Sequence, residues 1–204
     1  DKEQAENYLN LSLEGLFKIE ILVRQLLDYA KPHSSEREHI QLNELLDDVL
    51  SLTRLRLKDK HINQKKDFAE ELPVIKGDAH YLEQVFVNII LNACDSMDDD
   101  GNLEVTTESD EDEVIVYIKD NGCGISEENL KKIYDPFFTT KQQSNGTGLG
   151  LYLSYNAIKE HGGIIEAESE VDKGTRFKIR FPAIVDKEKS EKPAEEEQIG
   201  RAHV

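Results

Sequence analysis

Residues 114–125 read Val-Ile-Val-Tyr-Ile-Lys-Asp-Asn-Gly-Cys-Gly-Ile, an apolar run that ends in an acidic, glycine-rich loop. The β-branched residues of the first part predict a strand at 114–119. Asp120 ends this strand, where a carboxylate is placed to accept a hydrogen bond from an exocyclic amine such as that of adenine. Gly122 and Gly124 would let a planar ring approach the backbone closely. Taken alone, the segment is equally typical of an ordinary Asn-Gly turn.

Upstream of this loop, two asparagines are spaced four residues apart in Asn88-Ile-Ile-Leu-Asn92-Ala93. On a helix this spacing projects both carboxamides from one face. Carboxamide oxygens are hard, neutral ligands that suit Mg2+, which takes its other oxygens from water and phosphates. The alternative is a pair of asparagines on a solvated helix edge.

Downstream, the segment Gly146-Thr147-Gly148-Leu149-Gly150-Leu151 precedes a stretch with the apolar spacing of an amphipathic helix. Glycines at alternate positions before a helix bring backbone N–H groups and the positive helix end towards an anion, typically phosphate. The pattern is neither a Walker loop nor Gly-x-Gly-x-x-Gly. A flexible hinge is the alternative interpretation.

Between these loops lies Asp135-Pro136-Phe137-Phe138-Thr139-Thr140-Lys141. The two phenylalanines are interpreted as an anchor for a mobile segment, and Lys141 is placed to reach phosphate. Residues 142–145 are small or polar, as expected of a closing lid. A hydrophobic plug under a loop is the alternative, and the two readings are compatible.

From Ile40 onward the patterns predict an α/β domain. Asn43 is expected to cap a first helix that runs to about Leu55, and Gly77-Asp78 to open a second that carries Asn88 and Asn92. Late strands arranged as hairpins indicate a sheet with helices on one face. Strands are expected at 40–42, 62–68, 103–107, 114–119, 164–168 and 176–181.

The two ends of the chain differ in character from this domain. Residues 5–30 carry leucines mostly three and four apart and predict one long helix, which Pro32 and the polar residues 33–38 end. This helix either packs on its own domain or forms half of a helical hairpin or dimer bundle. The stretch 186–197 is dominated by charged residues and is expected to be disordered.

The composition excludes several functions. The 204 residues include 42 acidic and 25 basic side chains, for a formal charge of −17, which argues against nucleic acid as a partner. A hydrophobic content of 38% still allows a core. The chain opens with Asp1 rather than Met, so we interpret it as a fragment. Cys94 and Cys123 are too few for a disulfide scaffold and suit a reducing cytosol, a redox switch at Cys123 being the less favoured reading.

In this order and spacing, the four segments resemble the ATP-binding domain of the sensor histidine kinases, whose superfamily includes DNA gyrase, a heat-shock chaperone and the mismatch-repair clamps. Residues 88–93 match the N box, 120–124 the first glycine box, 136–140 the F box and 146–151 the second glycine box. Residues 174–177 resemble the family's last block. The resemblance covers roughly residues 41–182. It implies an α/β two-layer sandwich of a mixed five-stranded sheet and three helices, a Bergerat-type fold, with Mg-ATP under a lid.

The resemblance also implies roles for individual residues. Asn92 would be the Mg2+ ligand, with Asn88 beside it at the phosphates, and these two with Lys141 form the expected catalytic set. Asp120 would bind the adenine amine, supported by Thr175 and Gly124. The residues expected to bind ATP are Asp120, Gly122, Gly124, Thr140, Lys141, Gly146, Thr147, Gly148, Leu149, Gly150 and Thr175.

Two positions refine the expected chemistry. Superfamily members that hydrolyse ATP carry a Glu four residues before the metal-binding Asn, whereas this chain has Asn88, an amide that cannot act as a base near neutral pH. A kinase, which relies on positioning and charge neutralisation, is therefore favoured over a hydrolase. Asp95 stands where many histidine kinases have a basic residue. It cannot bind phosphate directly, so it is expected to orient a metal-bound water or a lid group.

The resemblance divides the chain into four parts: the second helix of the dimerisation and phosphotransfer hairpin at 1–32, a linker at 33–39, the catalytic domain at 40–183 and a charged tail at 184–204. The hairpin's first helix, with its phosphoacceptor histidine, is missing, because none of the six histidines has the H-box context. We therefore expect ATP to be the substrate and the acceptor histidine to lie on a helix outside this chain.

The implied partners are that helix, a response regulator receiver domain and a second copy in a full-length homodimer. The implied location is cytoplasmic, as the inner part of a sensor. Two alternatives stay open: a protein-serine kinase of the anti-sigma type, and a non-catalytic nucleotide-sensing or dimerisation module.

Overall fold

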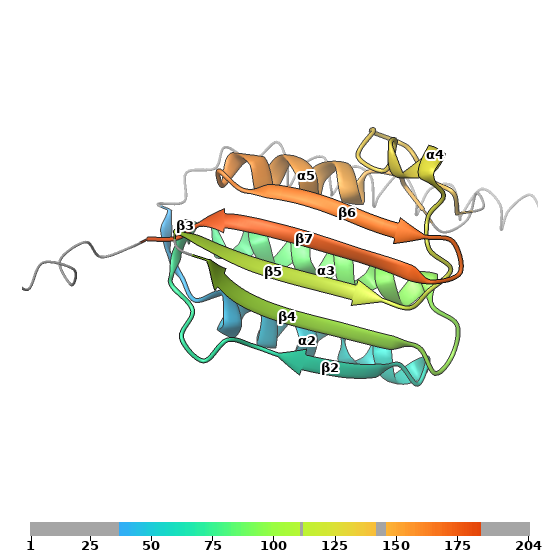
Figure 1. Ribbon diagram of the computed structural model, residues 1–204, viewed down its shortest axis with the longest axis horizontal. Helices are drawn as coiled ribbons and strands as arrows, with labels where there is room; N and C mark the ends of the chain where they lie inside the picture. The colour runs from blue at the N-terminus through green and yellow to red at the C-terminus, as the bar shows by residue number, and fades with distance from the viewer. Residues whose placement is uncertain (1–36, 111, 142–145, 185–204) are drawn as a thin grey trace, which may run out of the picture.

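A computed structural model describes residues 37–110, 112–141 and 146–184 (Figure 1). The predicted helix at 5–30, the expected lid residues 142–145 and the charged tail lie outside the described residues. So do His33 and His203, two of the six histidines.

The centre of the domain is a five-stranded mixed sheet (Figure 1). Strand β2 runs parallel to β4, and the other neighbours are antiparallel, with Val116 opposite both Thr107 and Ile179. In spatial order the strands are β2 (Asn63–Asp67), β4 (Asn102–Asp110), β5 (Glu113–Asp120), β7 (Gly174–Pro182) and β6 (Ile164–Glu170). A separate antiparallel pair is formed by β1 (Glu38–Ile40) and β3 (Ile75–Gly77).

Three long helices form the second layer: α2 (Leu42–Asp59), α3 (Ala79–Ser96) and α5 (Gly150–Glu160). Figure 1 shows α2 and α3 behind the sheet. The core between the layers takes alternate strand residues, such as Val116 and Ile118 of β5, and the apolar face of each helix. The two-layer α/β sandwich expected from the sequence is confirmed. The described residues add a fourth, one-turn helix, α4 (Glu127–Leu130).

The start of α2 differs from the prediction. The strand expected at 40–42 is β1, which ends at Ile40, and Leu42 is already helical. Asn43 is not the cap, because that position belongs to Gln41, whose side chain makes no capping bond. The Asn43 amide instead donates to the Ala69 carbonyl at 2.9 Å and accepts from the Thr107 hydroxyl at 2.8 Å. Thr107 is buried and needs a partner, so the amide ties α2 to β4 rather than ending the helix.

The predicted start of α3 is confirmed. The Asp78 carboxylate accepts a hydrogen bond from the Tyr81 N–H at 3.2 Å, as an N-cap does. The Asp78 N–H donates to Nε2 of buried His161 at 2.9 Å, and Nδ1 of the same ring lies 2.7 Å from the Ala157 carbonyl oxygen. His161 therefore joins the first turn of α3 to the end of α5.

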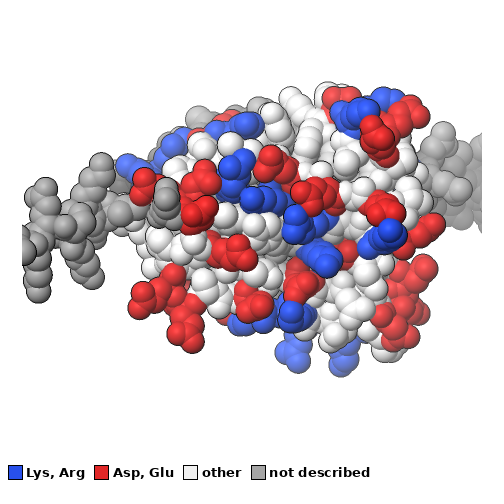
Figure 2. Space-filling model, in the orientation of Figure 1, with Lys and Arg blue, Asp and Glu red and all other residues white. Residues whose placement is uncertain are grey.

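The face of the sheet opposite the helices carries charged side chains. Figure 2 shows basic residues gathered near the middle of this face with acidic residues around them. Arg176 and Lys178 lie over the ring of Tyr117 at 5.4 and 5.8 Å, and Arg176 also pairs with Glu168 at 2.7 Å. Among the described residues, no helix combines the length and apolar character that crossing a membrane requires.

Candidate functional site

The carboxylate of Asp120 organises one end of the site. It lies at the end of β5 and is 4% exposed. Its Oδ1 accepts hydrogen bonds from the Gly122 N–H at 2.8 Å, the Ser96 hydroxyl at 3.2 Å and the Thr175 N–H at 3.3 Å. All three described bonds go to one oxygen, so Oδ2 is the atom left to accept from a ligand.

Burial raises the pKa of Asp120, although the three donors favour its charged form. A carboxylate that is desolvated and held by fixed donors is a selective hydrogen-bond acceptor. This is the arrangement that recognition of an exocyclic amine requires.

Glycines surround Asp120 because the backbone crowds there. At Gly122 an added methyl group would collide with Ser96, and at Gly174, whose φ is 101°, it would collide with the Asp120 carbonyl. Gly124 has a φ of 66° and lies against the carbonyl of Glu170. Thr175 thus donates its backbone N–H to Asp120, and the first glycine box contacts the carboxylate through the Gly122 N–H rather than through Gly124.

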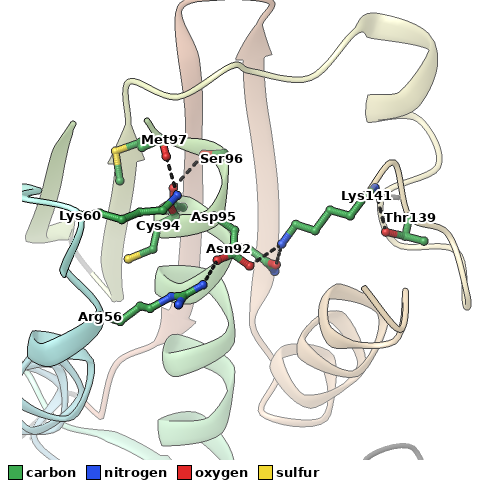
Figure 3. A network of polar contacts seen from close by, with 10 residues as sticks. Arg56, Lys60, Asn92, Cys94, Asp95, Ser96, Met97, Thr139 and Lys141 are labelled. Carbon is green, nitrogen blue, oxygen red and sulfur yellow. Dashed lines mark hydrogen bonds and ion pairs between the residues drawn. The ribbon is translucent and has the colours of Figure 1, made fainter. Parts of the chain in front are cut away.

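The last two turns of α3 form the other end of the site (Figure 3). Lys141 reaches across to this helix, where its ammonium donates to the Asp95 carboxylate at 2.8 Å and to the Asn92 amide oxygen at 3.3 Å. Arg56 of α2 contacts the other carboxylate oxygen of Asp95 at 3.2 Å. The structure therefore brings together Asn92 and Lys141, two of the three expected catalytic residues.

Asp95 keeps its charge in this arrangement. Desolvation acts to raise its pKa, but the hydrogen bonds and positive charges of Lys141 and Arg56 outweigh that effect and lower the pKa below its usual value. Among the described residues, Asp95 pairs with Lys141, just before the expected lid, and its orienting role towards a metal-bound water or a lid group stays a prediction.

Lys60 closes the end of α3. Its ammonium donates to the carbonyl oxygens of Cys94 at 2.9 Å and Met97 at 2.7 Å (Figure 3). These carbonyls belong to the negative end of the helix, where a cation is favourable. The same turn binds the first glycine box, since the Cys123 N–H donates to the Ser96 carbonyl at 2.9 Å.

Asn88 lies between α3 and α5. Its amide nitrogen donates to the hydroxyl of buried Ser154 at 3.0 Å. A methyl group on Gly150 would collide with the Asn88 amide oxygen, so the first turn of α5 packs directly on this side chain. The third expected catalytic residue is therefore fixed beside the N-terminus of α5.

The segment before α5 is partly as expected. Phe138 packs on the core, but Phe137 is 69% exposed, so the prediction that both phenylalanines are anchors is wrong for Phe137. The Phe137 backbone has a φ of 66° and lies against Gly148, where a side chain would not fit. Phe137 therefore contacts the second glycine box through its backbone and not through a buried ring.

The remaining predicted residues lie along the same stretch. Gly146 lies against the Thr139 hydroxyl, Thr140 is exposed, and the Leu149 N–H donates to the Thr147 hydroxyl at 3.4 Å. Leu149 is the N-cap residue of α5 and is buried. The glycine box thus leads into a helix N-terminus, as predicted.

A cavity of about 580 Å³ lies next to this site, between α2, α3 and α5. It shares Asn88, Gly150 and Ser154 with the site, but its lining is mostly apolar and contains neither Asp120 nor Asn92. The residues expected to contact adenine and metal therefore gather outside this cavity.

The sequence missed three contributors: Ser96, Arg56 and Lys60. Ser96 lies four residues after Asn92, on the same helix face, so the spacing rule could have found it. Arg56 lies on α2 and Lys60 is its C-cap residue, and only the packing of α2 on α3 brings them to the site. No local pattern signals such a contact.

The two cysteines are in different surroundings. Cys94 is buried, and its pKa is raised to about 11 by desolvation. Cys123 is exposed. Nothing in the described contacts of Cys123 favours the redox reading, since its sulfur lies 3.7 Å from the Gly124 carbonyl and near no described partner cysteine.

A comparison with known families identifies the class. Residues 77–184, more than half of the chain, match the family described as histidine kinase-, DNA gyrase B-, and HSP90-like ATPase. The chain belongs to this family, and its described domain is an ATP-binding catalytic domain of the sensor histidine kinase type.

Individual relatives agree with this assignment. Sporulation kinase A of Bacillus subtilis is 38% identical over 88% of this chain and 30% of its own length. The signal transduction histidine-protein kinase AtoS of Escherichia coli is 34% identical over 87% of this chain and 29% of its own length. The chain thus spans less than a third of these relatives.

Solved structures show the same fold. The catalytic domain of histidine kinase ThkA, in a nucleotide-free form, superimposes with a TM-score of 0.66 at 32% identity, covering 73% of this chain and 97% of that one. ThkA in complex with the response regulator TrrA gives a TM-score of 0.71 at 29% identity, covering 90% of this chain and 52% of that one.

Proposed function

We propose that this chain binds Mg-ATP and transfers the γ-phosphoryl group to a histidine on a helix of the same kinase that lies outside this sequence. The observation that carries nucleotide binding is the buried Asp120 carboxylate, whose Oδ1 is held by three donors while Oδ2 is left for the adenine amine. The glycines around it let the neighbouring backbone pack closely enough to hold the carboxylate in place.

The phosphate end of the site supports a kinase. Asn92 has the donor chemistry that Mg2+ accepts, a neutral amide oxygen, and it lies 3.3 Å from the Lys141 ammonium. Bound Mg2+ would neutralise phosphate charge. Lys141 would orient the phosphates, together with the backbone N–H groups of Gly148 and Gly150 at the N-terminus of α5.

An asparagine at position 88 favours phosphoryl transfer over hydrolysis of ATP. It is hydrogen-bonded to Ser154, and an amide does not take a proton from water near neutral pH. The γ-phosphoryl group should therefore survive until a histidine arrives, and the histidine itself supplies the nucleophile.

The wider context is also a proposal. Residues 1–32 would be the second helix of the dimerisation and phosphotransfer hairpin, 33–39 the linker, 40–183 the catalytic domain and 184–204 the charged tail. Strand β1 begins at Glu38, within the proposed linker. We place the chain in the cytoplasm as part of a homodimeric sensor that passes phosphate to a response regulator. ThkA, a relative, has been solved with such a regulator.

Calorimetry with Mg2+ and a non-hydrolysable ATP analogue tests nucleotide binding. Wild-type chain should bind, and Asp120→Asn, which replaces an acceptor oxygen with a donor amide, should weaken binding about 10- to 100-fold. Binding that is absent, or unchanged by Asp120→Asn, would instead indicate a non-catalytic module.

Labelled ATP tests the transfer. The chain alone with Mg2+ should stay unlabelled, and acid-labile label should appear on an added hairpin from a related kinase that carries an H-box histidine. Acid-labile label on the chain itself would show that the acceptor is present after all, and acid-stable label on a partner would identify a serine kinase.

A further inference from the structure

Three charged side chains from three separate segments meet beside Asn92 (Figure 3). Arg56 comes from α2, Asp95 from α3 and Lys141 from the segment before the second glycine box. The side chains of Asp95 and Lys141 are about one-third exposed, and Arg56 is more open. Each cation contacts a different oxygen of the Asp95 carboxylate.

We propose that Asp95 is a positioning residue that holds the Lys141 ammonium over the amide oxygen of Asn92. This inference rests on the proposed nucleotide site. Lys141 has a long, flexible side chain, and its charge alone does not fix where the ammonium lies. The 2.8 Å bond to Asp95 and the 3.3 Å bond to Asn92 together specify one position.

The positive charge of Arg56 reduces the repulsion between the Asp95 carboxylate and nearby phosphates. An unpaired Asp95 would repel a polyanion, whereas the three side chains together carry a net charge of +1. Arg56 is always charged and engages the oxygen that Lys141 does not use. The cluster thus presents a positive charge to the ligand although its centre is acidic.

The sign of the change in nucleotide affinity on Asp95→Asn distinguishes a positioning role for Asp95 from simple repulsion of phosphate. If Asp95 positions Lys141, Asp95→Asn should weaken the binding of Mg2+ with a non-hydrolysable ATP analogue, about three- to ten-fold. If Asp95 only repels phosphate, removing its charge should tighten binding. Asp95→Glu, which keeps the carboxylate, should recover most of the affinity. Glu128→Gln on α4 removes an exposed ion pair with Lys132 and serves as the matched control.

A double-mutant cycle shows whether Asp95 acts through Lys141. In the Lys141→Met background, Asp95→Asn should cause no further weakening. The same weakening in both backgrounds would overturn the proposal, because Asp95 would then act by another route, such as holding α2 to α3 through Arg56.

A nucleotide-free measurement tests the contact directly. Acetylation of individual lysines, followed by mass spectrometry, should show Lys141 reacting several-fold faster in Asp95→Asn than in wild type, while Lys131 stays unchanged. Equal Lys141 reactivity in the two proteins would overturn the inference. A wild-type chain that binds no nucleotide would overturn the proposed function, whereas normal binding that Asp95→Asn leaves unchanged would overturn only this inference.

Discussion

At the scale of single residues, the site depends on side chains whose polar atoms are held by backbone and neighbouring groups. Asp120 receives its three hydrogen bonds from the first glycine box, the start of β7 and α3, and Asn88 is fixed by Ser154 and Gly150. Small substitutions at the glycines should therefore affect the functional groups directly.

Gly150→Ala is such a substitution. The added methyl group would collide with the Asn88 amide oxygen, so we expect the unfolding free energy to fall by about 1–2 kcal/mol. In an Asn88→Ala background, where the amide is absent, Gly150→Ala should cost little further stability in urea unfolding. Binding of the Mg2+-bound ATP analogue should not return, since Asn88 is gone. If Gly150→Ala costs as much stability in the Asn88→Ala background as in wild type, the collision is not the cause.

The raised pKa of Asp120 predicts opposite effects of pH on stability and binding. A carboxyl whose folded-state pKa is raised by burial destabilises the fold when ionised, and this penalty is relieved as pH falls through the folded pKa. Urea unfolding should therefore show wild type gaining stability relative to Asp120→Asn as pH is lowered from 7 towards 4.

In the proposed function the Asp120 carboxylate accepts from adenine, so nucleotide binding should weaken over the same pH range. A wild-type chain that loses stability relative to Asp120→Asn on acidification would mean that the three donors outweigh burial.

At the scale of elements, α3 connects the two ends of the site. Its last two turns carry Asn92, Asp95 and Ser96, so the proposed metal-binding and adenine-binding ends share one helix terminus. Lys60, the C-cap residue of α2, donates to the two carbonyls at that terminus. The position of α3 therefore sets the separation between the two recognition points.

The substitution Lys60→Met tests the contribution of the α3 C-terminus to stability and binding. It removes two hydrogen bonds from a charged donor at a helix C-terminus, and we expect a loss of about 1–2 kcal/mol in urea unfolding. Nucleotide affinity should also fall, because Ser96 contacts Asp120 from the same turn. Lys58→Met, an exposed change on the same helix, is the control and should alter neither quantity. Equal effects of the two changes would show that Lys60 acts through general charge.

The elements also show what the sequence could predict. The β-branched run at 114–119 and the Asp78 cap depend on local geometry, and both predictions are confirmed. Strand β3 is three residues long and α4 is a single turn, so neither has enough residues for a periodic pattern. Asn43 is a residue type that often caps helices, but its amide oxygen accepts a hydrogen bond from buried Thr107 of β4 instead. Arg56 and Lys60 also reach the site through long-range contacts, so no local pattern predicts their part in it.

At the scale of the whole molecule, the formal charge of −17 sets a condition on the proposed function. ATP is itself a polyanion, so the overall field opposes its approach. Binding must then rest on local neutralisation by Lys141, the backbone N–H groups before α5 and Mg2+. The net +1 charge of Arg56, Asp95 and Lys141 is small against the charge of the chain.

We therefore expect the affinity for ATP to depend strongly on Mg2+. Replacing Mg2+ by a chelator should weaken ATP binding by about an order of magnitude or more, equivalent to at least about 1.4 kcal/mol. Adenosine, which has no phosphates, is the matched control and should bind equally with and without the metal, since it uses only the Asp120 end. Asn92→Ala should lose most of the Mg2+ dependence. A dissociation constant for ATP that chelator leaves unchanged would mean that the protein's own cations suffice, which the excess of acidic over basic side chains makes difficult to account for.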